Sequence, residues 1–461
     1  MCDNATEEKS GNRFLKNLHI AKGKGGKNMK AFGKLLTGVM LTGVLACGAA
    51  CAPAEGAETP DDGDKTGSSG FSQQLTFADK AVISQDSNHA YARIVEADDG
   101  TLIATGEDFA DSGIPIYRST DQGKTFTKNE ENIHDPAYEG YAFDARWQPT
   151  LYVLPQDVGT EMQKGDILLV ATSIDGSAET FYTTVINVYI SKDVGLTWSF
   201  LSEVTRSKNM ANSDGNENGC WEGNLYVNAE GMLTCIFADE TDHKNHSQRI
   251  ALKTTSDGRN WSELKEVVAL ESPTQRPGMP CVTQMKDGKY LLTIEMVGEN
   301  GVPIYWKTSD DGIDWGPVTE KGSKIQTTVK VIDAISGKER NTTAFPGSSP
   351  FCVWTPYGKD ENGTIFVTAQ RTEYAGTRPA DAAMNNFFVS YDLGATWSLI
   401  DHPIAYFENN NNRPAYSNSM NLSQDGKNMY VVNTVLGLEN SVNNVIVFAN
   451  VDLEASLQKT T

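Results

Sequence analysis

Short apolar runs, each bounded by a turn, recur at an even spacing along most of this chain. Six of them follow a turn that contains glycine, and each of these turns follows another strand-like run. The glycines are Gly100, Gly165, Gly231, Gly288, Gly363 and Gly426, at intervals of 65, 66, 57, 75 and 63 residues. Two strand-like runs joined by a tight glycine turn predict a β-hairpin. Six hairpins at near-constant spacing predict an all-β fold, a six-bladed β-propeller.

A second repeat is interleaved with the hairpins. It runs from Ser or Thr through Asp and Gly to an aromatic residue, with five copies at 119–126, 191–198, 254–261, 308–315 and 390–397. We expect the Asp and hydroxyl side chains to bond the turn backbone and the glycine to take a positive φ. The fourth copy places this Asp at Asp310, and the third has Ser256 instead. The copies resemble the Asp-boxes of sialidases and related glycosidases, in which the boxes are structural, so we assign them no catalytic role.

The N-terminus has a different composition from the rest of the chain. Lys30 and Lys34 precede an apolar stretch, 35–46, which is too short for a transmembrane helix and predicts a signal peptide. Its end, Val-Leu-Ala-Cys47, resembles a bacterial lipobox and predicts lipidation of Cys47. The alternative is an ordinary secretory signal and a secreted protein.

These patterns divide the chain into three parts. Residues 1–47 form the signal region, of which 1–28 precede Met29 and are interpreted as a mis-start. Residues 48–71 form a flexible linker of small and polar residues, and 72–461 form the catalytic propeller. We therefore expect an exported protein, anchored by lipid at a bacterial cell surface.

The net charge of −21 limits the partners. A polyanion would be repelled, so nucleic acid and an anionic membrane surface are excluded, and the membrane is reached through the lipid anchor only. The negative net charge is compatible with an oligosaccharide or polysaccharide as partner. We expect a monomeric protein. The chain has six His and no cluster of His, Cys and Asp at ligand spacing, so we expect no metal and no cofactor.

One face of the predicted propeller gathers chemistry-bearing residues. Adjacent strands are antiparallel, so the start of the first strand and the end of the second lie on the same face of each blade. This rule selects candidates for a glycan site: Arg93, Trp147, Trp221, Glu222, Asp239, Arg276, Glu295, Arg371 and Tyr416. Glu295 closes the apolar run Tyr-Leu-Leu-Thr-Ile, where a carboxylate is costly unless it is paired or used. Asp239 and Arg371 also fit rim charges or internal ion pairs, and Trp221 also fits core packing.

Four stretches allow a more specific prediction of the family: 220–226, 237–243, 276–280 and 290–295. They resemble the exo-arabinanase-type propellers of glycoside hydrolase family 93, over roughly residues 85–450. The resemblance implies a retaining exo-α-L-arabinanase-like enzyme whose catalytic pair is Glu222 and Glu295. Gly223 departs from the family pattern, where proline is expected. We assign Glu222 as nucleophile and Glu295 as acid/base, although the sequence leaves that order open.

The remaining candidates are assigned to substrate binding. Trp147 and Trp221 suit stacking on sugar rings, while Arg93, Arg276 and Tyr416 suit positioning of hydroxyls. Asp239 and Arg371 complete this set.

Two other functions remain open. An exo-α-sialidase would use Arg93, Arg276 and Arg371 around the substrate carboxylate and Tyr416 as nucleophile. Against it, the sequence Tyr91-Ala-Arg93-Ile-Val inserts a residue into the sialidase start motif and lacks its proline. The third function is a non-catalytic glycan-binding propeller, since propellers often only bind.

The lipobox generates a direct test. Cys47→Ala should move the protein from the membrane fraction to the soluble fraction, because the thiol that would carry the lipid is gone. Fractionation and mass spectrometry of the mature N-terminus measure this. A wild-type protein that is already soluble, with its N-terminus elsewhere, would exclude the anchor.

Overall fold

The computed structural model describes ten segments of the chain: residues 75–78, 80–85, 87–136, 143–175, 183–207, 219–332, 336–379, 382–407, 413–436 and 443–457. All of them belong to one compact unit, Gly70–Thr461. The predicted signal region with Cys47 and the linker lie outside the described residues. Within those ten segments, no helix is long and apolar enough to cross a membrane.

The described chain is all-β, as predicted. Its only helical elements are a 3₁₀ turn, η1 (Lys286–Gly288), and one short helix, α2 (Leu453–Ser456). Each predicted hairpin is present, with its glycine between the first two strands of an antiparallel sheet. All six of these glycines have a φ between 68° and 88°, which is the left-handed conformation that such turns require.

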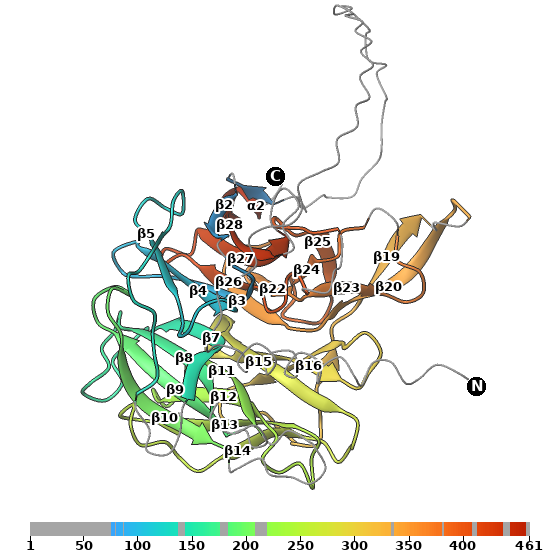
Figure 1. Cartoon of the computed structure of the whole chain (residues 1–461). Helices are drawn as coiled ribbons and strands as arrows, with labels where there is room; N and C mark the ends of the chain where they lie inside the picture. The colour runs from blue at the N-terminus through green and yellow to red at the C-terminus, as the bar shows by residue number, and fades with distance from the viewer. Residues whose placement is uncertain are drawn as a thin grey trace, which may run out of the picture. The chain divides into compact units, whose positions relative to one another are not determined.

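Six sheets follow one another along the described segments (Figure 1). The first has β3 (His89–Glu96), β4 (Leu102–Asp108), β5 (Ile116–Ser119) and β6 (Thr127–Lys128). The second has β7 (Phe143–Val153), β8 (Ile167–Asp175), β9 (Thr184–Ser191) and β10 (Ser199–Arg206). The third has β11 (Cys220–Val227), β12 (Leu233–Asp239), β13 (Arg249–Thr255) and β14 (Lys265–Ala269).

The fourth sheet has β15 (Arg276–Gln284), β16 (Tyr290–Val297), β17 (Ile304–Ser309) and β18 (Ser323–Lys324). The fifth has β21 (Phe351–Thr355), β22 (Thr364–Thr368), β24 (Asn386–Ser390) and β25 (Ser398–Asp401). The sixth has β26 (Ser419–Leu422), β27 (Asn428–Leu436) and β28 (Asn444–Asp452), and β28 also pairs with β1 (Thr76–Phe77) and β2 (Ala81–Ser84). The sixth sheet therefore joins strands from both ends of the described chain.

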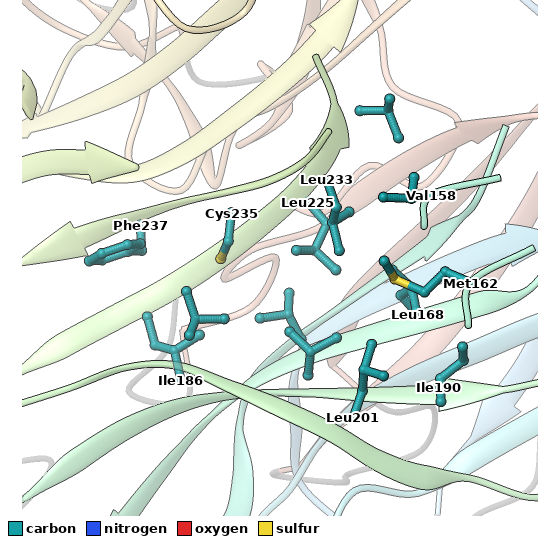
Figure 2. Packing of buried hydrophobic residues seen from close by; sticks show 14 of the residues in the cluster. Val158, Met162, Leu168, Ile186, Ile190, Leu201, Leu225, Leu233, Cys235 and Phe237 are labelled. Atoms are coloured by element: carbon teal, nitrogen blue, oxygen red, sulfur yellow. The ribbon is translucent and has the colours of Figure 1, made fainter. Parts of the chain in front are cut away.

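Consecutive sheets pack through their first strands and through apolar cores. Strand β3 contacts β7, β7 contacts β11, and the series continues through β15, β21 and β26, which contacts β3 again. A buried apolar cluster lies between each pair of neighbours, including one between the sixth and first sheets that contains Ile94, Val432 and Phe448. Figure 2 shows the cluster between the second and third sheets, where Leu168 and Ile186 face Leu225, Cys235 and Phe237.

A seventh, three-stranded sheet is inserted beside the fifth, and we call it the added sheet. It comprises β19 (Thr327–Ile332), β20 (Glu339–Gly347) and β23 (Arg371–Tyr374). Strand β23 begins with Arg371 directly after β22, so the added sheet carries one of the predicted site residues. The sequence repeats gave no sign of this sheet.

The Asp-box turns form as expected, with two corrections. In the first copy Asp121 accepts hydrogen bonds from the Ser119 hydroxyl (2.8 Å) and from the Thr125 N–H (3.0 Å). In the third copy this role falls to Asp257, and in the fourth to Asp311, which accepts from the Ser309 hydroxyl at 2.9 Å. The predicted Ser256 and Asp310 are each one residue early, because these two boxes are a residue shorter before the glycine.

The Asp-box glycines test the packing between sheets. Gly123 in the first box has φ +84°, and a Cβ there would lie 2.2 Å from the Phe448 ring of β28. Gly100 has φ +85°, and a Cβ there would meet nothing within 4 Å. Both alanine variants share the backbone strain, but only Gly123→Ala adds a steric clash.

We expect Gly123→Ala to lower the free energy of unfolding by about 1–3 kcal/mol more than Gly100→Ala does. Urea unfolding of the soluble domain measures the difference. Equal losses in the two variants would mean that the first box does not pack against the sixth sheet.

Candidate active site

A break in strand register recurs near the start of the first strands. It falls after Ala90 in β3, after Trp147 in β7, after Trp221 in β11 and after Gly278 in β15. Each break contains a non-glycine residue in the left-handed region: Tyr91 (φ 52°), Gln148 (54°), Glu222 (64°) and Met279 (49°). Ser348 and Ser349 before β21, and Ala415 and Ser417 before β26, share this conformation. Such bulges redirect a side chain, at a cost of about 1–2 kcal/mol for each left-handed residue.

Glu222 is held at its bulge by three neighbouring sheets. Its Oε1 accepts a hydrogen bond from the Tyr91 hydroxyl (3.1 Å), and its Oε2 accepts one from the Met279 N–H (2.9 Å). The Glu222 N–H donates to Gln148 Oε1 at 3.0 Å, and the Gln148 N–H donates to Glu107 Oε1 at 2.8 Å. The bulges of the first four sheets therefore fix one carboxylate, and the side chain of Glu222 is only half-buried.

Glu295, on β16, lies opposite Gly278, the residue before Met279. Its Oε2 accepts hydrogen bonds from the Ser349 N–H (2.8 Å) and the Ser348 hydroxyl (3.1 Å). Glu295 pairs with Gly278 in the β15–β16 ladder, and a Cβ on Gly278 would lie 3.4 Å from Glu295 Oε1. The adjacent residues Gly278 and Met279 thus link the two glutamates, since Gly278 pairs with Glu295 and the Met279 N–H donates to Glu222, and the charge of Glu295 acts on Glu222.

Burial and neighbouring charges shift the pKa of both carboxyls. Burial raises the pKa of Glu222 to about 7, the charge of Glu295 raises it as well, and the bonds from Met279 and Tyr91 oppose the rise. Burial also raises the pKa of Glu295, but the bonds from Ser349 and Ser348 and the positive charges of Arg276 and Arg371 oppose it. Near neutral pH, Glu222 is therefore partly protonated; Arg276 favours the ionised form of both carboxyls, and Arg371 favours that of Glu295.

Trp221 and Arg276 meet at a shared carboxylate on the rim. Glu240, which is buried at the end of β12, accepts a hydrogen bond from Trp221 Nε1 (3.2 Å) and forms an ion pair with Arg276. Arg276 also donates to Gln248 Oε1 at 2.8 Å, and its side chain is 38% exposed. The strand rule reaches Glu240 as well as Asp239, but the sequence assigned Glu240 no role.

The other predicted aromatic and cationic residues lie around this centre. The Tyr416 ring meets the Tyr91 ring edge-on, with centroids 5.5 Å apart, and Arg413 lies over Tyr416. Trp147 packs edge-on against Phe109 and is 8% exposed. Arg371 is half-buried, pairs with Glu373 and donates to Gln370 Oε1 at 3.1 Å.

Asp239 and Arg93 are directed to other partners. Asp239 Oδ2 accepts from Arg249 Nε (2.7 Å), and its Oδ1 accepts from the Thr241 N–H (3.0 Å), which is the internal ion pair that the sequence left open. Arg93 is buried and donates to the Ser417 carbonyl (2.7 Å) and hydroxyl (2.8 Å). Neither contact involves Glu222 or Glu295.

A possible metal-ligand group lies away from these carboxyls. Among the described residues, Asp242, His246 and Glu266 have ligand atoms within 4.8 Å of one another. Arg249 already pairs with Glu266 at 2.6 Å and with Asp242 at 3.6 Å, so a cation in this group would be close to a guanidinium.

Comparison with solved structures identifies similar proteins. The chain is similar to the α-L-arabinanase of Penicillium chrysogenum complexed with arabinobiose (TM-score 0.63, 29% identity, covering 82% of this chain and 99% of that chain). It is also similar to an α-L-arabinofuranosidase from Fusarium graminearum in complex with an iminosugar inhibitor (TM-score 0.63, 27% identity, 84% of this chain and 99% of that chain). A sialidase from Streptococcus pneumoniae shares the fold (TM-score 0.50, 11% identity, 84% of this chain and 71% of that chain).

No family model and no curated protein matches the sequence. The structural neighbours confirm the predicted resemblance to a sialidase-like propeller of the family 93 type, and they support the predicted enzyme class, a glycoside hydrolase.

The raised pKa of Glu222 has a consequence for stability. Because the folded state holds this proton more tightly than the unfolded state, the free energy of unfolding falls as pH rises from about 4.5 to about 7. Glu222→Gln removes that loss, on the order of 2–3 kcal/mol. We expect the variant to melt above the wild type at pH 8, with a smaller difference at pH 4.

Differential scanning calorimetry at the two pH values measures this difference. Glu263→Gln, a change at an exposed residue, is the matched control and should follow the wild type. A Glu222→Gln advantage of equal size at pH 4 and pH 8 would show that Glu222 does not titrate in this range.

Proposed function

We propose that this protein is an exported glycoside hydrolase that cleaves a neutral glycan from its end, with an exo-α-L-arabinanase-like activity. The observation that carries the proposal is the pair of carboxylates, Glu222 and Glu295, on either side of Gly278–Met279. Glycoside hydrolysis needs one carboxylic acid and one carboxylate facing the same sugar. The α-L-arabinanase that this chain resembles binds arabinobiose, which supports a glycan of that class as substrate.

We assign Glu222 as acid/base and Glu295 as nucleophile, the reverse of the order proposed from sequence. A general acid works best with a pKa near the working pH, and that of Glu222 is raised to about 7. Arg276 and Arg371 favour ionised Glu295, as a nucleophile requires.

In this mechanism Glu295 attacks the anomeric carbon while Glu222 gives its proton to the departing glycosidic oxygen. Glu222 then takes a proton from water, which attacks the glycosyl ester, releases Glu295 and leaves the anomeric configuration retained.

The rim residues are assigned to substrate binding. Glu240 orients Trp221 and Arg276 together, so a ring stacked on the indole would place its hydroxyls near the guanidinium. Tyr416 and Arg371 interact electrostatically with the carboxyls from other sheets, whereas the buried Trp147 ring packs against Phe109.

The arginine contacts favour this function over a sialidase. A sialidase site needs three arginines directed at one substrate carboxylate. Here Arg93 bonds Ser417, Arg276 pairs with Glu240, and Arg371 pairs with Glu373. The proposed tyrosine nucleophile of that function, Tyr416, contacts the Tyr91 ring.

The architecture and location belong to the same proposal. We infer six blades from the six consecutive sheets, the contact of β26 with β3 and the completion of the sixth sheet by β1 and β2. The added sheet is then an insertion between blades four and five. Export and a lipid anchor at Cys47 rest on the lipobox alone.

The carboxylate pair is tested by substitution. Either Glu222→Gln or Glu295→Gln should lower kcat on debranched arabinan by several orders of magnitude, and the double variant should be little worse than the worse single one, because the pair acts as a unit. Tyr416→Phe should lower kcat far less. A sialyl substrate cleaved by the wild type, with Tyr416→Phe inactive, would favour the sialidase instead.

Azide distinguishes the two roles. With an aryl α-L-arabinofuranoside carrying a good leaving group, Glu222→Ala plus azide should give the α-azide, because azide replaces water at the glycosyl enzyme. Glu295→Ala plus azide should give the β-azide by direct displacement. The opposite pairing of products and variants, read by NMR, would restore the order assigned from sequence.

A further inference from the structure

Arg93 is a buried cation whose hydrogen-bond partners are all neutral. It is 7% exposed and donates to the Ser417 carbonyl, the Ser417 hydroxyl, the Ala92 carbonyl (3.0 Å) and the Thr150 hydroxyl (3.4 Å). The rings of Tyr91 and Phe351 lie 5.5 Å and 5.2 Å from its guanidinium carbon.

The guanidinium has no counter-ion at contact distance within the described part of the chain, where Arg93 takes part in none of the ion pairs within 4.0 Å. Glu107 and Glu222 favour its charge only from farther away, and burial lowers its pKa to about 10. Buried charges in proteins are normally paired, because an unpaired one loses its hydration without compensation. The site therefore lacks one negative charge in contact with Arg93.

A small cavity adjoins this guanidinium. It has a volume of about 20 Å³, and its lining includes Arg93, Thr150, Asn224, Cys281, Phe351 and Ser417. That is room for at least one occupant of the size of water. The Thr150 and Ser417 hydroxyls both accept from Arg93, so each still has its own proton to donate.

We propose that this cavity binds one monovalent anion, with chloride as the natural occupant. The anion would accept hydrogen bonds from Arg93 and from the Thr150 and Ser417 hydroxyls. Water could accept the same bonds but would leave the guanidinium without a counter-charge.

Glu222 also lines the cavity, which couples the anion to the proposed acid/base. Tyr91 and Cys281 face the same space, and Glu107 and Glu295 act on Arg93 or on Glu222 from the strand ends. An ionised Glu222 repels the anion, so anion binding and protonation of Glu222 strengthen each other by the same factor. Anion binding itself does not depend on the proposed function; only an effect on activity would.

Bromide is the probe for occupancy. Crystals of the wild-type protein grown in sodium bromide should show an anomalous peak beside Arg93, with Thr150 and Ser417 as neighbours. Melting temperatures in sodium chloride should exceed those in sodium gluconate at equal ionic strength, and the difference should be larger at pH 5.5 than at pH 8. In Glu222→Gln the chloride effect should no longer depend on pH.

Variants of the two hydroxyls test the site without removing the charge. Thr150→Val combined with Ser417→Ala should lose the bromide peak and weaken the chloride effect at least tenfold in apparent Kd. Ser202→Ala, a buried hydroxyl on β10 that bonds Trp261, is the matched control and should keep both.

An ordered water at this position with no anomalous signal would overturn the proposal, as would an unchanged chloride response in the double variant. These readouts need no turnover, so they stand apart from a failure of the hydrolase assignment.

Discussion

The site depends on one backbone constraint, a left-handed residue at the start of the first strand in sheet after sheet. Tyr91, Gln148, Glu222 and Met279 occupy this position, and the other three each form a hydrogen bond with Glu222. Without the bulge, Glu222 would alternate with its neighbours along a regular strand, and its side chain would point into a core between sheets. The strain of the left-handed residues is offset by the apolar clusters that fix every sheet against the next.

Electrostatics follow from that geometry. Ionising both carboxyls beside one short backbone segment costs free energy, because burial and mutual repulsion favour a state in which one proton is retained. Each carboxyl accepts two hydrogen bonds, and Arg276 favours the ionised form of both, whereas the positive charge of Arg371 acts on Glu295. Different roles for two identical side chains therefore require only different neighbours, which the strand ends of separate sheets supply.

The sequence predicts the repeats well and the local geometry poorly. Glycine turns and Asp-boxes have fixed chemistry, so their positions follow from composition, apart from the one-residue shifts to Asp257 and Asp311. The strand rule places Glu222 and Glu295 on one face because it needs only strand direction. The rule cannot distinguish the roles of Asp239 and Glu240. Asp239 pairs with Arg249 and Glu240 pairs with Arg276, and this choice depends on the bulge and on cross-strand pairing. The left-handed residues themselves share no side-chain type that a pattern could detect.

The strand rule selects three arginines, Arg93, Arg276 and Arg371. Their burial and ion pairs determine whether they could bind a charged substrate. A cation recognises an anionic sugar only if its charge is not already compensated. Arg276 and Arg371 are paired with Glu240 and Glu373, and beyond these pairs their charges favour the ionised form of Glu295. Arg93 keeps an unpaired charge but is buried, with its guanidinium hydrogen-bonded to Ser417. A sugar carboxylate would thus meet two carboxyls and no accessible, uncompensated guanidinium. This is one reason to propose a neutral glycan as the substrate, even though arginine is abundant around the site.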